Sequence, residues 1–205
     1  VVPLIIALVF GYTSFVYGSE SIIERTSEHL ESVAVLKENQ FNSYLNERLE
    51  ELLDLSEQEL IVNYLNEFHY LNKNYDENEE EEQEAKVQKL LNERLLHYRS
   101  EEIFVILLNG KVDISTDNKQ KGKIKLQEDY FNEGLKSIFV QSFYYSLSTQ
   151  KPAITLSVPI KNENNVTIGV IAGNIITEDI STIMEEKSGL GETGETYLVN
   201  QYNLL

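Results

Sequence analysis

The first eighteen residues carry no charged side chain, and this constrains the architecture of the chain more than any other feature. As a helix they would extend about 27 Å at about 1.5 Å per residue, close to a bilayer core of about 30 Å. Their apolar residues show no amphipathic period, which disfavours a core helix. Residues 1–18 are therefore predicted to form a transmembrane helix. The alternative is a signal peptide cleaved between Gly18 and Ser19, which would release a secreted protein, such as an enzyme.

The charge of the chain lies entirely beyond that segment. All 34 acidic and all 17 basic residues follow residue 18, so residues 19–205 carry the whole net charge of −17. Such a surface repels nucleic-acid phosphates and anionic inner leaflets, which argues against nucleic acid as a partner. Residues 19–205 are therefore predicted to be extracytoplasmic, anchored to the cell membrane. The chain has no cysteine, so it has no disulfide framework and no thiolate site.

Residues 19–66 contain neither proline nor glycine, and apolar side chains recur among them at helical spacing. One helix of this length exceeds the dozen or so residues typical of a compact domain, whereas a helix that rises out of a membrane explains it. Its inner part is predicted to form a coiled-coil homodimer, and its outer part to lay an apolar stripe on a sheet. The alternative, part of a helical bundle, requires more apolar helices downstream than the sequence contains.

An acidic stretch, residues 72–84, separates the long helix from a second helical pattern. Calcium-binding loops place a glycine among their carboxylates, and this stretch has none. It is therefore interpreted as a solvated loop followed by a first helical turn, where glutamates favour the positive end of the helix dipole.

Beyond residue 100 the period changes to that of strands. Two apolar runs flank Asn109 and Gly110, a typical hairpin turn. A short helix is expected over residues 129–140, and three more strands over 143–147, 153–160 and 166–176. The fold class is thus α+β, in which a transmembrane helix continues into a long helix and is followed by a five-stranded antiparallel sheet.

The C-terminal stretch begins with a helix expected to start from Thr177 as its N-cap and to end near Lys187. Gly189, Gly191 and Gly194 then match the spacing of a dinucleotide-binding loop. In such loops, however, the glycines follow a strand and open a helix, and here they follow a helix and precede a strand-like segment. They are interpreted as a helix cap and a loop. The final strand has no partner in the sequence, so the chain is expected to be a fragment with a poorly packed tail.

Seven segments of the chain form a recognisable set, namely residues 33–37, 44–48, 104–110, 129–134, 151–160, 168–170 and 189–200. Together they resemble a double Cache sensor, a PAS-like extracellular input module of prokaryotic histidine kinases and chemoreceptors. The resemblance implies a membrane-distal module over 67–176, a connecting helix and glycine-rich loop over 177–194, and the first strand of a truncated second module over 195–205. It also implies that the chain is the ligand-sensing region of a signalling receptor. A histidine kinase is favoured as that receptor, with a methyl-accepting chemotaxis receptor as the alternative. A structural or adhesive surface protein without a pocket is the alternative.

The resemblance also implies a small-molecule site between the sheet and the elements that cross it. The candidates are Tyr130 and Phe131 of the short helix and Tyr144, Tyr145 and Ser146 of the third strand. For each aromatic residue the alternative is an ordinary place in the core. Strand alternation sends Tyr144 and Tyr145 to opposite faces.

Two positions depart from the pattern of the family members that bind amino acids. Glu128 stands where these carry an arginine for the ligand carboxylate, and Asn174 where they carry an aspartate for the ammonium group. Glu128 repels a carboxylate and Asn174 lacks a negative charge, which argues against amino-acid binding by that pattern. Glu128 instead favours a cationic or polyhydroxylated ligand, unless it faces solvent.

Enzymatic and metal sites have no support in the sequence. His29, His69 and His97 are scattered, without the spacing of a zinc motif, and no nucleophile elbow or Walker lysine motif occurs. Thr155 and Ser157 alternate with apolar residues and are expected to be half-exposed. No catalytic residue, metal or cofactor is predicted for this region.

Overall fold

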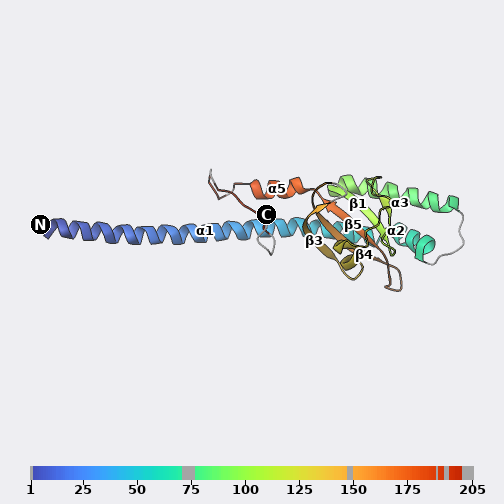
Figure 1. Ribbon diagram of the computed structural model, residues 1–205, viewed down its shortest axis with the longest axis horizontal. Coiled ribbons are helices and arrows are strands. Elements are labelled where there is room, and N and C mark those ends of the chain that lie inside the picture. The colour runs from blue at the N-terminus through green and yellow to red at the C-terminus, as the bar shows by residue number, and fades with distance from the viewer. Residues whose placement is uncertain (1, 71–76, 147–149, 188, 192–193, 200–205) are drawn as a thin grey trace.

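A single helix, α1 (Val2–Ser56), carries the chain from its N-terminus to a sheet domain at the far end (Figure 1). The computed structural model describes residues 2–70, 77–146, 150–187, 189–191 and 194–199. With 55 residues, α1 is roughly 80 Å long at about 1.5 Å per residue. Pro3 lies in its first turn, where the missing N–H has no helical partner to lose.

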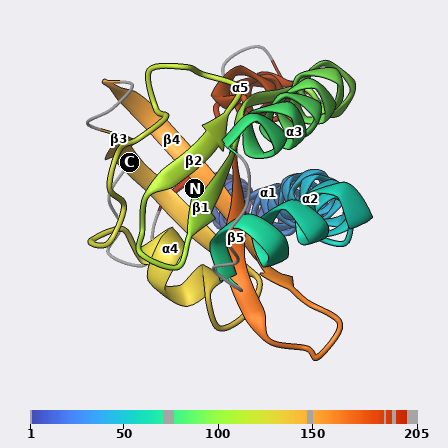
Figure 2. The ribbon, with the colours of Figure 1, turned by 90° about the vertical axis from the view of Figure 1, so that its right-hand side faces the viewer.

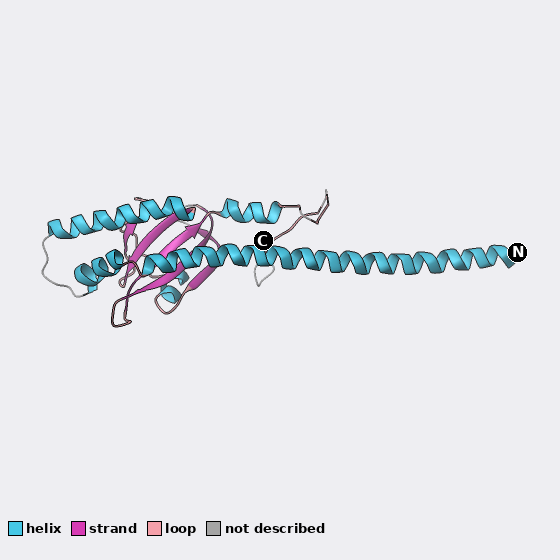
Figure 3. Cartoon of the chain, turned by 180° about the vertical axis from the view of Figure 1, so that it is seen from behind, coloured by secondary structure: helices cyan, strands magenta, loops and turns pink. Residues whose placement is uncertain are grey.

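The N-terminal part of α1 projects away from the sheet domain (Figure 3). Its apolar side chains Ile5, Ile6, Val9 and Phe10 are all more than half exposed. Among the described residues, α1 is the one helix long and apolar enough to cross a membrane.

The predicted helix over residues 19–66 is wrong at its outer end, because it breaks after Ser56. Gln58 adopts an extended conformation, and a new helix, α2 (Glu59–Tyr64), begins after it and continues as a π-helix, η1 (Leu65–Tyr70). The Ser56 hydroxyl donates to the carbonyl of Leu53, which supports the helix end locally. The turn lets Leu55 and Ile61 enter the same core although the chain changes direction between them.

Five strands form one sheet in the order β2-β1-β5-β4-β3, and all neighbours are antiparallel. This confirms the predicted sheet. The strands are β1 (Ser100–Leu107), β2 (Val112–Ser115), β3 (Phe139–Ser146), β4 (Lys151–Lys161) and β5 (Thr167–Ile175). Gly110, with φ of 78°, occupies the predicted β1–β2 turn, where its positive φ is free of strain.

The short helix predicted over residues 129–140 is also shorter than expected. It forms α4 (Asp129–Gly134), and Phe139 and Val140 already belong to β3, paired with Ser157 and Leu156 of β4. Strand pairing outweighs the weak helical preference of this segment.

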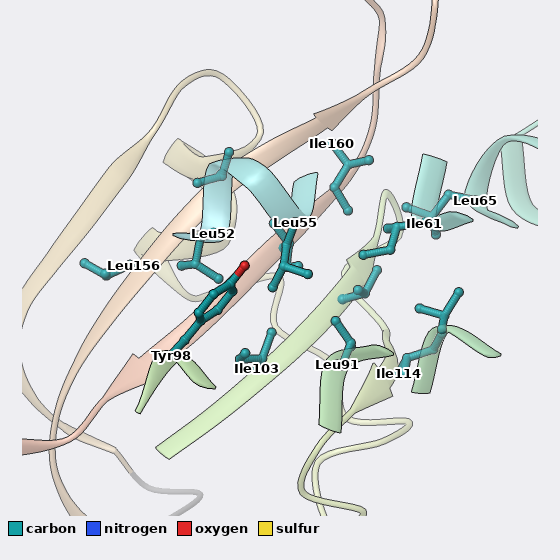
Figure 4. Close-up of a cluster of buried hydrophobic side chains, with 14 of the residues drawn as sticks. Leu52, Leu55, Ile61, Leu65, Leu91, Tyr98, Ile103, Ile114, Leu156 and Ile160 are labelled. Atoms are coloured by element: carbon teal, nitrogen blue, oxygen red, sulfur yellow. The ribbon is translucent and has the colours of Figure 1, made fainter. Parts of the chain in front are cut away.

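The helices α1, α2 and α3 (Glu77–Tyr98) cover one face of the sheet, and α4 lies on the other (Figure 2). Between the helices and the sheet lies the main hydrophobic core. Leu52, Leu55, Ile61 and Leu91 from the helices meet strand residues such as Ile103 and Leu156 there (Figure 4). Burial of these side chains holds the outer part of α1 on the sheet.

After β5 the chain forms α5 (Thr177–Glu185), which runs beside α1 (Figure 1). The predicted N-cap is wrong by one residue, because Ile176 takes that position without a side-chain hydrogen bond. Residues 194–199 have no regular secondary structure, and residues 200–205 of the predicted last strand lie outside the described chain. Leu198 nevertheless packs against the main core, which is more packing than we expected of this tail.

Candidate ligand-binding site

The face of the sheet that α4 covers carries a continuous row of hydrogen-bonded polar side chains. Ser115 donates to one oxygen of Glu102 at 2.8 Å, and the amide of Asn174 donates to the other at 3.0 Å. Thr155 donates to the amide oxygen of Asn174 at 2.7 Å, and the Tyr144 hydroxyl lies 2.8 Å from the Thr155 hydroxyl. We call Ser115, Glu102, Asn174, Thr155 and Tyr144 the polar row.

Strand register brings these residues together. Glu102 of β1 is paired with Asn174 of β5, which is in turn paired with Thr155 of β4. Because side chains alternate between faces, all three point to the side opposite the main core. Glu102 and Asn174 are 3% and 5% exposed, and Thr155 is fully buried. A row of polar groups at this depth is uncommon in a sheet and is stabilised only because its members satisfy one another.

Glu102 is the ionisable group of the row. Burial raises its pKa to about 7, although the hydrogen bond from Ser115 and the nearby ammonium group of Lys125 act in the opposite direction. The site therefore contains a carboxyl group that changes its charge near neutral pH.

Aromatic side chains cover the row. The rings of Phe104 and Tyr130 meet edge to face with centroids 6.0 Å apart, and the rings of Tyr130 and Tyr144 lie 6.4 Å apart. Phe131 is buried in the same cluster. Tyr130 is 2% exposed, and burial raises the pKa of its hydroxyl, which therefore stays neutral. Aromatic faces beside a few oriented polar groups are typical of small-molecule sites.

The segment between β2 and α4 adds two charged residues. Lys125 is 7% exposed, and its ammonium group lies 6.0 Å from the centre of the Phe104 ring. Burial lowers its pKa, and Glu128 and Glu102 partly counteract this effect. Glu128 precedes α4, is half-buried, and its charge raises the pKa values of Tyr130 and Tyr144, for which burial is the largest cause.

Most of the residues predicted for the site meet on this face. Tyr130, Phe131, Tyr144 and Asn174 belong to the row or to its aromatic cover, and Glu128 lies at its edge. Ser146, at the end of β3, is buried and its side chain interacts with the Tyr144 hydroxyl.

Tyr145 does not join them. It is 60% exposed, and its hydroxyl donates to the backbone carbonyl of Gln150. Alternation along β3 thus leaves Tyr144 as the inward tyrosine and removes Tyr145 from the candidate site.

Sequence reasoning missed Glu102, Ser115 and Lys125, and it described Thr155 wrongly. Thr155 and Ser157 were expected to be half-exposed, but both are fully buried. The available signal was the polar side chains at inward positions of β1 and β4. Their significance depends on strand order, which the sequence pattern alone does not determine.

The described residues contain no group of three or more histidine and acidic side chains that could hold a metal ion. The structure defines a cavity of about 600 Å³ elsewhere, between α5, Phe143 of β3 and the residues of the tail. It lies outside the row and shares none of its residues.

A family model described as a Cache domain, dCache_1, matches residues 18–205. No curated protein matches the sequence. Among solved structures, the sensor domain of the Vibrio cholerae histidine kinase DctB aligns at 13% identity and a TM-score of 0.63, over 77% of this chain and 58% of that one. The ligand-binding domain of the Campylobacter jejuni chemoreceptor Tlp3, in complex with 4-methylisoleucine, aligns at 20% identity and a TM-score of 0.63, over 84% and 65%.

The E. coli DcuS sensor domain, in contrast, is covered almost completely. It aligns at 16% identity and a TM-score of 0.53, over 71% of this chain and 97% of that domain. At these identities the structures show a shared fold, while the chain spans 58% of the DctB and 65% of the Tlp3 structures. The family match extends over nearly the whole chain, and the chain therefore belongs to the Cache domain family, whose members are extracellular sensor domains of membrane receptors.

Proposed function

We propose that residues 19–205 form the ligand-sensing region of a membrane-bound signalling receptor, and that the ligand is a small molecule bound at the polar row and its aromatic cover. The observation that carries this proposal is the hydrogen-bonded chain from Ser115 to Tyr144, buried on the face away from the main core. A sheet that needed only stability would place apolar side chains there, because burying polar groups gains little over burying apolar ones.

Membrane anchoring is a second part of this proposal. Residues 1–18 span the bilayer in this proposal, and the sheet domain stands outside the cytoplasm. The exposed apolar side chains at the start of α1 support this, since Phe10 and Phe15 are each 72% exposed. A cleaved signal peptide has the same sequence features, and detection of residues 1–18 in the mature protein by mass spectrometry separates the two.

The partner of α1 in this proposal is a second copy of the chain. Ile22, Ile23 and Leu30, beyond the predicted span, are between 51% and 68% exposed. A parallel pair of α1 helices would bury these side chains.

The signal passes from the row to α1 through β5 and α5. Asn174 lies on β5, and α5 begins three residues later. Tyr44 of α1 donates to Asp179 of α5 at 3.3 Å, and His29 lies 2.5 Å from the carbonyl oxygen of Gly189. A ligand that moves Asn174 would thus shift α5 relative to α1. Binding would then change the relative populations of two packing arrangements of α5 on α1.

The output of the full protein is a separate proposal, and we favour a histidine kinase, with a chemotaxis receptor as the alternative. Cache domains are themselves sensors and not catalysts. The buried polar row is the observation that favours sensing over a structural or adhesive role, because adhesion needs no polar groups at that depth.

Calorimetric titration of the chain in lipid nanodiscs against a library of small metabolites tests the sensing proposal. At least one compound is expected to bind. Tyr144→Phe is expected to lower the affinity for that compound, because it removes a hydroxyl group of the polar row. Tyr145→Phe is the matched control, since its hydroxyl lies on the opposite face. Absence of any binding, or equal loss in both variants, would contradict the assignment of the site.

A further inference from the structure

Glu102 combines deep burial with the absence of a charged partner. Its two oxygens accept hydrogen bonds from Ser115 and Asn174, which are neutral side chains. Among the described residues, no lysine, arginine or histidine nitrogen lies within 4.0 Å of the Glu102 carboxyl group. A buried carboxylate normally pairs with a cation, because neutral donors compensate only part of its lost hydration.

Lys125, the buried cation of this site, does not fill that role. Its ammonium group lies over the Phe104 ring and donates to the amide oxygen of Gln120 at 3.4 Å. Lys125 and Glu102 influence each other's pKa but form no ion pair, so each charge is desolvated separately. The fold thus holds the carboxyl group in a fixed orientation without neutralising it.

The other charges around Glu102 leave the site short of positive charge. The carboxylate of Asp117, in the segment after β2, and the ammonium groups of Lys123 and Lys125 act on Glu102 itself. Glu128, which precedes α4, acts on Lys125 and on the tyrosines of the site. Three acidic groups therefore face two basic ones.

We propose that Glu102 is the specificity-determining residue of the site and selects ligands that carry an ammonium or amidinium group. This inference rests on the proposed ligand-binding function. A carboxylate offers about four acceptor positions, and neutral donors occupy two of them at Glu102. A cationic group would use the remaining positions, while the faces of Tyr130 and Tyr144 would attract it through cation–π interactions.

The position of the Glu102 charge explains how the site could bind a cationic group although residue 174 is the neutral Asn174. Glu102 is the cross-strand partner of Asn174 and is bonded to it, so the negative charge lies one strand away from the last strand. Carboxylate ligands without a cationic group would be repelled by Glu102 and Glu128 alike.

Proton release accompanies binding if Glu102 receives a cation. Since burial raises the pKa of Glu102 to about 7, a fraction of the chain carries a neutral carboxyl group at neutral pH. A bound cation stabilises the ionised form and expels that proton. A residue with a purely structural role would show no such coupling to ligand.

The test uses the full chain in nanodiscs and three matched series of probes. These are primary alkylamines and arylalkylamines together with agmatine, the alcohols of the same size, and the carboxylates of the same size. At least one amine is expected to raise the melting temperature while its alcohol and carboxylate counterparts do not. Glu102→Gln is expected to lower the affinity for that amine at least tenfold, and Glu102→Asp is expected to retain a preference for the amine over the alcohol and the carboxylate.

Glu101→Gln is the matched control, because Glu101 is the neighbouring residue on β1 but is exposed and pairs with Lys151 at 3.4 Å. Calorimetry in two buffers of different ionisation enthalpy should show proton release in the wild type and none in Glu102→Gln. Circular dichroism of both variants checks that they are folded.

Each result decides between the two proposals. Binding of only alcohols or carboxylates, or unchanged amine binding in Glu102→Gln, would overturn the specificity of Glu102 and leave the sensing function intact. Failure of every probe and of the metabolite library would overturn the sensing function, and this inference with it.

Discussion

Lys37 of α1 donates a hydrogen bond of 2.6 Å to the backbone carbonyl of Ile183 in α5, although 146 positions separate them in the sequence. The side chain is 2% exposed, and its ammonium group also lies 3.4 Å from Glu186. A lysine at this point satisfies a carbonyl in the last turn of α5 and complements the negative end of the helix dipole. The contact ties the exit helix of the sheet domain to the helix that leads to the N-terminus.

Replacing Lys37 by methionine should therefore loosen α5. Methionine keeps most of the side-chain volume but removes the donor, and a hydrogen bond from a charged group contributes about 1.5–3 kcal/mol to stability. We expect the free energy of unfolding to fall by roughly that amount and amide exchange to accelerate in α5. Lys89→Met, at a residue 79% exposed on α3, should change neither quantity. Equal effects of the two substitutions would contradict the role of Lys37.

The pH dependence of stability should carry a contribution from Glu102. Its pKa rises from 4.5 to about 7 in the folded chain because burial disfavours the carboxylate. Between those values the folded chain retains a proton that the unfolded chain has released, so the free energy of unfolding falls as pH rises. The contribution is fully present below pH 4.5 and is lost above pH 7, with a size on the order of 3 kcal/mol at about 1.4 kcal/mol per pKa unit.

Urea unfolding of the chain in detergent micelles between pH 4.5 and 8 measures this slope. Glu102→Gln should flatten it, and Glu101→Gln should leave it unchanged. A residual slope of the same sign is expected from Glu51, whose pKa burial also raises to about 7. A Glu102→Gln curve parallel to that of the wild type would exclude the raised pKa.

The sheet was predictable from the sequence because its signals are local. The turn at Asn109 and Gly110 and the alternation along β4 and β5 specify strands without reference to the rest of the chain. The same alternation predicted that Tyr144 and Tyr145 point to opposite faces, but it did not determine which of the two points inward. The end of α1 at Ser56 was not predictable in this way, since residues 57 and 58 contain neither glycine nor proline and the turn serves the packing of Leu55 and Ile61.

The candidate site was predictable only in part. Tyr130, Phe131 and Asn174 were identified from a resemblance to the family, which indicates positions that the family uses. Glu102 and Thr155 join them because β5 lies between β1 and β4 in the sheet. Neither composition nor periodicity determines that order, so a charged residue near the start of a strand could not be distinguished from an ordinary exposed one.

Asp113 of β2 connects the sheet to α2 and η1. It accepts hydrogen bonds from Tyr64 at 2.7 Å and from His69 at 3.1 Å. Burial alone would raise the pKa of Asp113, but these two partners outweigh burial and lower it. Its contribution to stability is therefore present above its unfolded value of 3.8 and is lost as pH falls through the lower folded value.

Asp113→Asn should destabilise the chain by about 1.5–3 kcal/mol at pH 7, because a buried charge-assisted contact becomes a neutral one. The difference from the wild type should shrink at a pH below the folded pKa of Asp113, where the wild-type carboxyl is also neutral. Urea unfolding at both pH values measures it. Glu163→Gln, an exposed carboxylate in the β4–β5 turn, should have no effect at either pH. A difference that is independent of pH would attribute the effect to packing and not to charge.

Gly134 allows α4 to lie directly on the sheet and so to place Tyr130 over the polar row. A Cβ atom at this position would lie 2.7 Å from the Ser157 hydroxyl oxygen and 3.1 Å from a methyl group of Val170. Gly134→Ala should therefore displace α4 and destabilise the chain by about 1–3 kcal/mol, the usual cost of overpacking. Gly18→Ala, at a helical glycine with nothing within 4 Å, should be neutral or slightly stabilising.

Adding Ser157→Gly to Gly134→Ala should recover part of the lost stability, because the contact that causes the loss is removed. Urea unfolding of the single and double variants gives the coupling free energy, and strict additivity would show that Gly134 and Ser157 do not limit the approach of α4.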